Sequence, residues 1–328
     1  MNKNLTFVVA LFLIISSSLV LYADPETYES KQIKKIYSIG TASTNGTYYP
    51  FGNAISKLFS KNLKSLVAVA EPTAGSMANI NFLRKKQIDL ALVQSDVAWM
   101  AYHGSFIYNG NAFKDLRVLA SLYSEKIQIV VRSDSGINSL ADLKGKKISV
   151  GEKYSGSAAG AIQILEAAGL KQKEDYDLLY EKFNKGTELL LDGYIDAVYY
   201  VGAVPADGIK RLSEKIPIKL LEIPASVINE LMSKYPYYSK ESIEKDSYIG
   251  HSNAVATLGF KALLVCTEQL PDEEAMRILT VIYSSPNILS EQNEILVKLN
   301  RDEALKGVEA SMFHKGAANF FAAQNGNR

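Results

Sequence analysis

The sequence predicts an α/β protein of two similar lobes, each a mixed sheet flanked by helices. Apolar, strand-like runs alternate with amphipathic helical patterns along the chain, which favours layers of helices packed on sheets. One pattern of strand, polar loop and helix occurs twice, with Gly46 recurring as Gly156 and Asp89 as Asp196, offsets of 110 and 107 residues. No Gly/Ser-rich linker separates the copies, so we expect lobes joined by crossing strands.

The first copy begins with a short strand over residues 36–39, and Gly40 ends it. Residues 43–47 are loop and N-cap types, and the helix that follows carries an apolar stripe from Phe51 to Phe59. A helix N-terminus presents unpaired N–H donors and partial positive charge, which suits a carboxylate or another oxyanion. A capped turn without a ligand is the alternative. The loop lacks the glycines of a dinucleotide fingerprint and the Gly-Lys-Ser/Thr of a P-loop.

The next predicted strands cover residues 66–70 and 87–95, and the second ends in Gln94 and Ser95, where open α/β sheets bind ligands. Extended runs at residues 116–123 and 127–131 flank a candidate crossing segment, residues 123–126. A short helix is expected at residues 139–145.

The second copy has strands at residues 147–151 and 194–201 around a helix that starts after Ser157. Amphipathic helix with proline breaks follows over residues 209–248, then an extended run at 254–265 that returns to the first lobe, and a helical pattern over 273–325. We therefore expect lobe I to comprise residues 36–124 plus 255–328, and lobe II residues 125–254. Four polar helix starts, residues 43–47, 73–76, 155–157 and 186–187, are expected to border one cleft.

Composition places the chain among globular proteins, since 47% of its 328 residues are hydrophobic and 22% charged. The net charge of +1 gives no reason to expect a nucleic acid partner. Residues 1–23 resemble a signal peptide, with Lys3 before an apolar run and the small Ala23 at the candidate cleavage site. An uncleaved anchor is the alternative. No cysteine lies near that junction, so we expect a periplasmic protein without a lipid anchor.

No constellation for catalysis or metal binding is present. His103, His251 and His314 match no zinc spacing, and there is no G-x-S-x-G elbow. Asp89 and Asp196 are candidates for paired carboxylates, but each precedes the middle of an apolar strand at the same place in its copy, which favours a structural role at a helix-to-strand turn. The only cysteine, Cys266, lies in an apolar run and is predicted to be a buried strand residue, with a catalytic thiol as the alternative. We expect no cofactor, no metal and no enzymatic activity.

Tyrosines are numerous, 19 in all, and several fall where the cleft is expected, among them Tyr48, Tyr199 and Tyr200. Aromatic walls with a few polar groups are usual in small-molecule pockets. Because strand side chains alternate between faces, Tyr199 and Tyr200 cannot both face the cleft.

Four segments together resemble the TAXI family of solute-binding proteins, which serve tripartite ATP-independent periplasmic (TRAP) transporters. They are Ile39-Gly-Thr-Ala-Ser-Thr-Asn-Gly-Thr-Tyr-Tyr-Pro50, Asp89-Leu-Ala-Leu-Val-Gln-Ser-Asp96, Ser139-Leu-Ala-Asp-Leu-Lys-Gly-Lys-Lys-Ile-Ser-Val-Gly151 and Ile164-Leu-Glu-Ala-Ala-Gly-Leu170. The resemblance implies a periplasmic binding protein fold of type II-like architecture, which closes by a hinge around a small organic anion of the glutamate or 2-oxoglutarate class. It also implies delivery to TRAP membrane subunits, and we expect a monomer. The chain departs from the family at Glu125-Lys126, where Lys126 would add a cation to the cleft.

The expected ligand-binding residues combine the polar loops with the resemblance: Thr44, Asn45, Gly46, Thr47, Tyr48, Thr73, Ser76, Gln94, Ser95, Ser155, Gly156, Ser157, Tyr199 and Tyr200. Two alternatives remain. One is the receptor of an ABC importer or sensor system on the same fold, and the other is an exported enzyme that uses this scaffold.

Overall fold

The computed structural model describes residues 35–44, 46–64, 66–284 and 299–325. The segment from Lys35 to Arg328 forms one compact unit. The predicted signal peptide, residues 1–23, lies outside the described residues. None of the helices that the structure describes is long and apolar enough to span a bilayer.

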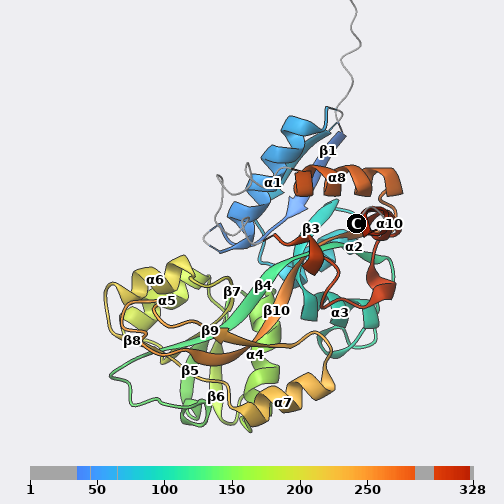
Figure 1. The fold of residues 1–328 in the computed structure, drawn as a ribbon. Helices are drawn as coiled ribbons and strands as arrows, with labels where there is room; N and C mark the ends of the chain where they lie inside the picture. Colours follow the sequence, from blue (N-terminus) through green and yellow to red (C-terminus); the bar gives the residue numbers. More distant parts are fainter. Residues whose placement is uncertain (1–34, 45, 65, 285–298, 326–328) are drawn as a thin grey trace, which may run out of the picture. The chain divides into compact units, whose positions relative to one another are not determined.

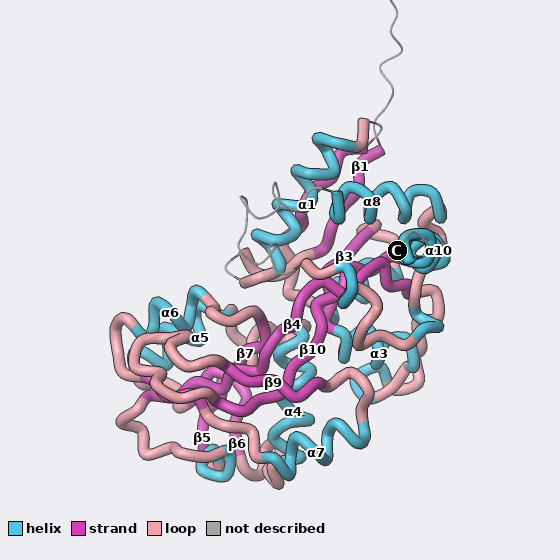
Figure 2. The backbone as a smooth tube through the Cα atoms, viewed as in Figure 1, coloured by secondary structure: helices cyan, strands magenta, loops and turns pink. Residues whose placement is uncertain are grey.

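Ten strands of the described chain form one mixed sheet, and Figure 2 shows helices on both sides of it. Its main path runs β2-β1-β3-β10-β4-β7-β5-β6, with β8 paired to β4 and β9 paired to β10. The strands are β1 (Lys35–Gly40), β2 (Leu66–Glu71), β3 (Leu90–Gln94), β4 (Leu116–Arg132), β5 (Lys146–Ser149), β6 (Tyr176–Leu179), β7 (Ala197–Gly202), β8 (Ile218–Leu220), β9 (Ser239–Ile243) and β10 (Val255–Thr267).

The helices of the described residues connect these strands and flank the sheet (Figure 1). They are α1 (Tyr48–Asn62), α2 (Ser76–Arg84), α3 (Ser95–His103), α4 (Gly156–Ala167), α5 (Phe183–Leu191), α6 (Asp207–Ser213), α7 (Ala225–Lys234), α8 (Asp272–Ser284) and α10 (Lys315–Asn325). Short 3₁₀ turns occur at Phe106–Tyr108, Leu140–Leu143, Arg301–Glu303 and Ala310–Met312.

The predicted repeat is present as two units of the same topology. In the first, β1, α1, β2, α2 and β3 give a parallel sheet in the order β2-β1-β3; in the second, β5, α4, β6, α5 and β7 give the order β6-β5-β7. We call the parts built on these units the first and second lobe. Because the carboxyl ends of parallel strands meet at one sheet edge, each lobe places the starts of its helices there.

Two long strands connect the lobes. The first part of β4 pairs with β10, and from Lys126 onward β4 pairs with β7 of the second lobe. β10 pairs first with β9 and then, from Ala262, with β3 of the first lobe. Figure 1 shows β4 and β10 running side by side between the lobes. The two-lobed α/β fold with crossing strands is therefore as predicted.

Three local expectations differ from the structure. The two runs at residues 116–131 are one continuous strand, β4, because the polar residues between them remain in the ladder with β10. The proline-broken segment 209–248 contains not only helices but also β8 and β9, which were not predicted. Helices α8 and α10 are separated at residues 299–314 by loops and 3₁₀ turns rather than continuing one helical pattern.

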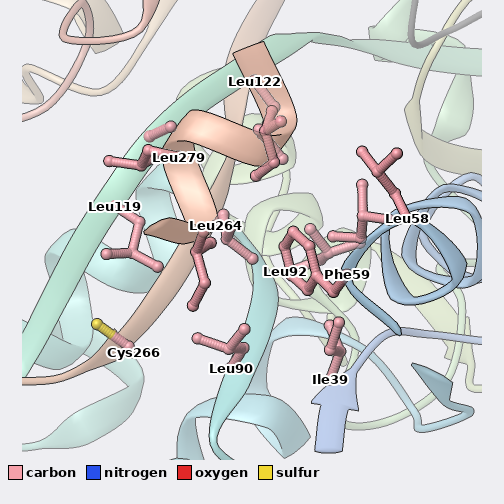
Figure 3. Packing of buried hydrophobic residues seen from close by; sticks show 14 of the residues in the cluster. Ile39, Leu58, Phe59, Leu90, Leu92, Leu119, Leu122, Leu264, Cys266 and Leu279 are labelled. Atoms are coloured by element: carbon pink, nitrogen blue, oxygen red, sulfur yellow. The ribbon is translucent and has the colours of Figure 1, made fainter. Parts of the chain in front are cut away.

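A hydrophobic core packs α1 and α8 against the first-lobe sheet (Figure 3). Phe59 of α1, Leu92 of β3 and Leu279 of α8 are fully buried in it. Cys266 of β10 belongs to the same core and is 0% exposed, and burial raises the pKa of its thiol. A buried, uncharged thiol is a poor nucleophile, as expected for a structural strand cysteine.

Asp89 and Asp196 perform the same backbone contact in the two lobes. Asp89 Oδ2 accepts a hydrogen bond from the Ser38 N–H (2.9 Å), and Asp196 Oδ2 accepts one from the Lys147 N–H (2.8 Å). Each carboxylate thereby ties the start of one strand to its parallel neighbour. This repeated contact gives both residues the structural role that their positions predicted.

Candidate functional site

A cavity of about 80 Å³ lies where helix starts from both lobes meet. Residues of β4, β7 and the loops after β1, β2 and β5 complete its walls. Its lining residues are Ala42, Ser43, Gly46, Thr47, Tyr48, Ala74, Gly75, Ser76, Gln94, Glu125, Gly151, Glu152, Ser155, Gly156, Ser157, Phe183, Tyr200 and Val201.

Four helix N-termini border this cavity, two from each lobe. Tyr48 starts α1, Ser76 starts α2, Gly156 starts α4 and Phe183 starts α5, and all four residues line the cavity. Such termini carry N–H donors that lack a partner within the helix, together with partial positive charge. The repeated strand-loop-helix unit therefore directs several hydrogen-bond donors at one small volume.

Nine of the predicted ligand-binding residues line the cavity. They are Gly46, Thr47, Tyr48, Ser76, Gln94, Ser155, Gly156, Ser157 and Tyr200. Asn45 lies outside the described residues. The structure thus brings together predicted residues that are up to about 150 positions apart in the chain, as the contact between Thr47 Oγ1 and Tyr200 Oη (3.3 Å) shows.

The other four predicted residues lie elsewhere. Thr44 is exposed in the loop after β1. The Thr73 hydroxyl bonds to Thr41 O (2.9 Å) and to Asn79 Oδ1 (2.7 Å), so it supports the loop backbone. Ser95 Oγ accepts a hydrogen bond from the Lys261 N–H (3.1 Å). Tyr199 is buried in the second-lobe core, and its neighbour Tyr200 points to the cavity, as strand alternation requires.

The fourth expected helix start differs by three residues. α5 begins at Phe183, so Phe183 rather than residues 186–187 reaches the cavity. Gly186 instead packs on β5, where an added Cβ would lie 2.6 Å from Ser149 Oγ, and Thr187 Oγ1 bonds to Asn184 O (2.8 Å). The echo of Gly75-Ser76 in Gly186-Thr187 placed the helix start one turn too late.

Sequence reasoning missed Glu125, Glu152 and Phe183 as lining residues. The Phe183 ring stacks on Tyr200 with centroids 3.8 Å apart and forms an aromatic wall. The sequence places Glu125 only in the candidate crossing segment, residues 123–126, and in the departure from the TAXI pattern. The signal that could have found it is the only acidic residue of strand β4, at the point where the strand changes lobes.

Glu125 is the buried acid of the cavity, only 2% exposed. Its Oε2 accepts a hydrogen bond of 2.7 Å from the Tyr48 hydroxyl. Burial raises the pKa of Glu125 to about 8, although the Tyr48 hydrogen bond opposes this rise. The expected cation is absent from the site, because the Lys126 ammonium bonds to Ser242 O and lies 3.8 Å from Glu241 Oε2 instead.

Gln94 lies against the start of α4 in the other lobe. A Cβ atom at Gly156 would lie 1.7 Å from Gln94 Oε1, so only glycine fits at this contact. Gln94 is 3% exposed, and its Oε1 atom has no hydrogen-bond partner. Its backbone N–H donates to Ser76 Oγ (3.1 Å). A buried, unpaired carbonyl oxygen facing a cavity is the kind of acceptor that a hydrogen-bond donor of a ligand satisfies.

The two lobes also make direct hydrogen bonds at the site. Tyr154 O accepts from the N–H groups of Met77 (3.1 Å) and Ala78 (3.2 Å), which occupies two donors at the α2 N-terminus. The first turns of α1 and α4 remain directed at the cavity. Among the described residues, no three His, Cys, Asp or Glu side chains gather as metal ligands. The arrangement can bind a small polar molecule between the lobes.

Solved structures of several binding proteins share this fold. PhnD1 from Prochlorococcus marinus (MIT 9301), in complex with methylphosphonate, matches with a TM-score of 0.58 and 15% identity over 89% of this chain and 98% of that one. XAC2383 from Xanthomonas citri, bound to ATP, matches with a TM-score of 0.53 and 11% identity over 81% of this chain and 90% of that one. A putative L-cystine ABC transporter protein from Listeria monocytogenes matches with a TM-score of 0.51 and 15% identity over 81% of this chain and 98% of that one. These similarities establish the two-lobed fold of periplasmic binding proteins.

The model of the NMT1-like family matches residues 39–324, most of the chain. This match corrects the resemblance to the TAXI family, and the fold is shared with a protein of an ABC transporter. The TRAP membrane subunits expected as partners, and glutamate and 2-oxoglutarate expected as ligands, rested on that resemblance and are withdrawn with it. The segment from Ser139 to Gly151 recurs across many binding-protein families, so by itself it does not distinguish the TAXI family from the others. The chain belongs to the NMT1-like family.

Proposed function

We propose that this protein is a non-enzymatic receptor that captures a small solute bearing an oxyanion, between its two lobes, for an ABC-type importer. The observation that carries the proposal is the cavity itself, where helix N-termini from both lobes meet the buried, unpaired Oε1 of Gln94. Helix N-termini favour anionic groups through their N–H donors and dipole. The unpaired Oε1 is a hydrogen-bond acceptor, so it is a second, independent sign of a missing ligand and calls for a donor group elsewhere on the same solute.

The importer class is supported by the family match and by the shared fold with a putative L-cystine ABC transporter protein. The oxyanion is supported further by PhnD1, which has this fold and is bound to methylphosphonate. We propose export to the periplasm through the signal peptide at residues 1–23. We also propose residues 36–124 with 255–328 as lobe I and residues 125–254 as lobe II, with hinge closure about β4 and β10.

The cavity volume limits the solute. A single water needs about 10–15 Å³ on this measure, so about 80 Å³ accommodates roughly six water-sized groups. The cavity thus suits a compact molecule of a few non-hydrogen atoms.

A thermal-shift screen of purified protein, freed of co-purified ligand, tests the proposal. The panel contains small carboxylates, phosphonates and sulfonates, with neutral sugars and polyols as the contrast. A ligand at 100 times its dissociation constant adds about 2.7 kcal/mol to the free energy of unfolding, which corresponds to several degrees in melting temperature. We expect oxyanion-bearing compounds alone to produce such a shift.

A pair of variants links any shift to the site. Gln94→Leu keeps most of the side-chain volume but removes the amide, so it should weaken binding at least tenfold. Gln87→Leu changes an exposed glutamine and should bind as the unmodified protein does. The oxyanion site would be refuted if only sugars raised the melting temperature. Equal affinity of the two variants for the ligand would refute it as well.

A further inference from the structure

Glu125 is a buried acid with no basic partner in the cavity. Among the lining residues that the structure describes there is no lysine or arginine, while Glu125 and Glu152 both carry carboxyl groups. A buried acid normally has a counter-charge or a full set of hydrogen bonds. Among the described residues, the Glu125 carboxyl accepts one side-chain hydrogen bond, from the Tyr48 hydroxyl at its Oε2.

Two lysines could balance these acids, but one is engaged elsewhere and the other acts on Glu152. Lys126 follows Glu125 in β4, but its ammonium binds Ser242 O and faces Glu241 of β9. The positive charge of Lys182 lowers the pKa of Glu152, which burial raises. Glu152 therefore has a basic neighbour and Glu125 does not. Alternate strand residues point to opposite faces, so Lys126 cannot turn toward Glu125 without leaving the ladder.

The hydrogen bond from Tyr48 prepares Glu125 to accept a cation. A hydroxyl that donates to one carboxylate oxygen stabilises the ionised acid. The second oxygen, Oε1, belongs to a side chain that lines the cavity. The stacked pair of Phe183 and Tyr200 lines the same cavity, and aromatic faces also favour a cation.

We propose that the natural ligand is a compact zwitterion, whose ammonium or amidinium nitrogen binds the Glu125 carboxylate while its oxyanion binds the helix N-termini beside Gln94. This proposal rests on the oxyanion receptor proposed above and names the second half of its ligand. A solute with only negative charge would lie beside the carboxyl groups of Glu125 and Glu152, and no positive group would offset the repulsion between these charges. Glu125 is thus the residue that selects amine-bearing solutes.

Matched pairs of probes test this selection. Each pair keeps the oxyanion and differs in one amine: alanine and propionate, aminomethylphosphonate and methylphosphonate, aminomethanesulfonate and methanesulfonate. Isothermal titration at pH 7.5 gives the ratio of dissociation constants within each pair. Where a pair binds, we expect its amine-bearing member to bind at least tenfold more tightly than its amine-free member.

Two variants assign the discrimination to one carboxyl. Glu125→Gln keeps the shape and a hydrogen-bond acceptor but loses the charge, so the tenfold ratio should fall to about threefold or less. Glu152→Gln tests whether the other acid of the cavity carries the selection instead, and Glu166→Gln, on the exposed side of α4, is the control that should keep the ratio. Circular dichroism and the melting temperature show that the variants remain folded, and binding of the amine-free probe provides a second check on the site.

The outcomes separate the two proposals. Equal binding of both members of every pair that binds, or an unchanged ratio in Glu125→Gln, overturns the role of Glu125 and leaves the oxyanion receptor intact. Failure of every oxyanion probe to bind overturns the receptor proposal, and this inference with it. A ratio that falls in Glu152→Gln and persists in Glu125→Gln assigns the selection to the wrong acid and also overturns the inference.

The direction of the pH dependence provides a further test. Charged or titratable groups that interact with Glu125 are Tyr48 of α1, Asp96 of α3, Tyr123 of its own strand and Tyr200 of β7. If Glu125 must lose its proton to bind a cation, affinity for the amine-bearing probe rises between pH 6 and 8. A protonated Glu125 that donates to an oxyanion would give the opposite slope, and that result would contradict the proposal.

Discussion

The carbonyl oxygen of Tyr154 accepts a hydrogen bond of 3.1 Å from the backbone N–H of Met77. Tyr154 lies in the loop before α4 and Met77 in the first turn of α2, so this bond joins the two lobes directly beside the cavity. A second bond from the Ala78 N–H (3.2 Å) ends at the same oxygen. This contact between the lobes therefore satisfies two helix-terminal donors, which would face water if the lobes were apart.

Hydrogen exchange should report this contact. Saturation with the tightest compound from the oxyanion screen should slow amide exchange at Met77 and Ala78 at least tenfold, because their acceptor lies on the other lobe. The Leu170 N–H, which donates to Leu165 O (2.9 Å) inside the second lobe, should keep its rate and serves as the control. Equal slowing at all three amides would indicate general stabilisation instead of lobe closure.

Removal of the Tyr48 hydroxyl should destabilise the protein. In Tyr48→Phe the Glu125 carboxyl loses its hydrogen-bond donor while it remains buried, which costs about 1–3 kcal/mol in the free energy of unfolding. Urea denaturation at pH 7 measures this change.

The neighbouring residue offers a matched control. Tyr49→Phe removes the same hydroxyl one position later in α1, where the side chain is only half-buried, and should cost less than about 0.5 kcal/mol. Similar losses in both variants would show that the hydrogen bond to Glu125 carries no special stabilisation.

Gly156→Ala should block the cavity. The added methyl group would occupy a point 1.7 Å from Gln94 Oε1 and 2.8 Å from Ser76 Oγ, so the lobes or these side chains must shift. Overpacking of this kind costs about 1–3 kcal/mol, equivalent to roughly 5- to 150-fold in affinity. Titration calorimetry with the screened ligand measures the loss.

Glu166→Ala on the exposed side of the same helix is the control for that variant and should leave affinity unchanged. The fold should survive in both cases, because alanine is the better helix former. Undiminished affinity in Gly156→Ala would mean that the ligand does not require this approach of Gln94 to α4.

The ligand-free protein should become less stable as pH rises from about 5 to 8. Burial raises the pKa of Glu125 to about 8 and that of Asp96 to about 7, above the ordinary values of 4.5 and 3.8. In this window the unfolded chain has released protons that the folded protein still holds, so the free energy of unfolding falls with increasing pH. Urea midpoints at several pH values measure the slope.

The double variant Glu125→Gln, Asp96→Asn removes both acids and should flatten that slope. A stability that rises from pH 5 to 8 in the unmodified protein would show that these carboxyls are ionised in the fold.

Several parts of the site followed from local sequence. The polar residues after β1 and before α4, and the polar end of β3, could be found because loops and helix caps use characteristic residue types within a few positions. Phe183 could not be found in this way, because the start of α5 depends on how the apolar stripe of that helix packs. The echo of Gly75 in Gly186 indicated a later start. Glu125 was hidden for a different reason, since its burial arises from helices and strands far away in the chain.

The sequence by itself determined the two-lobed α/β architecture, the repeat, and the structural roles of Asp89, Asp196 and Cys266. These features depend on periodicity and on contacts within one supersecondary unit. Only the tertiary structure decided that Tyr200 rather than Tyr199 reaches the cavity, that Lys126 bonds to β9 instead, and that Glu125 has no basic partner in the cavity. Strand register and the packing of the lobes fix which face each side chain occupies, and neither is encoded in any short stretch of residues.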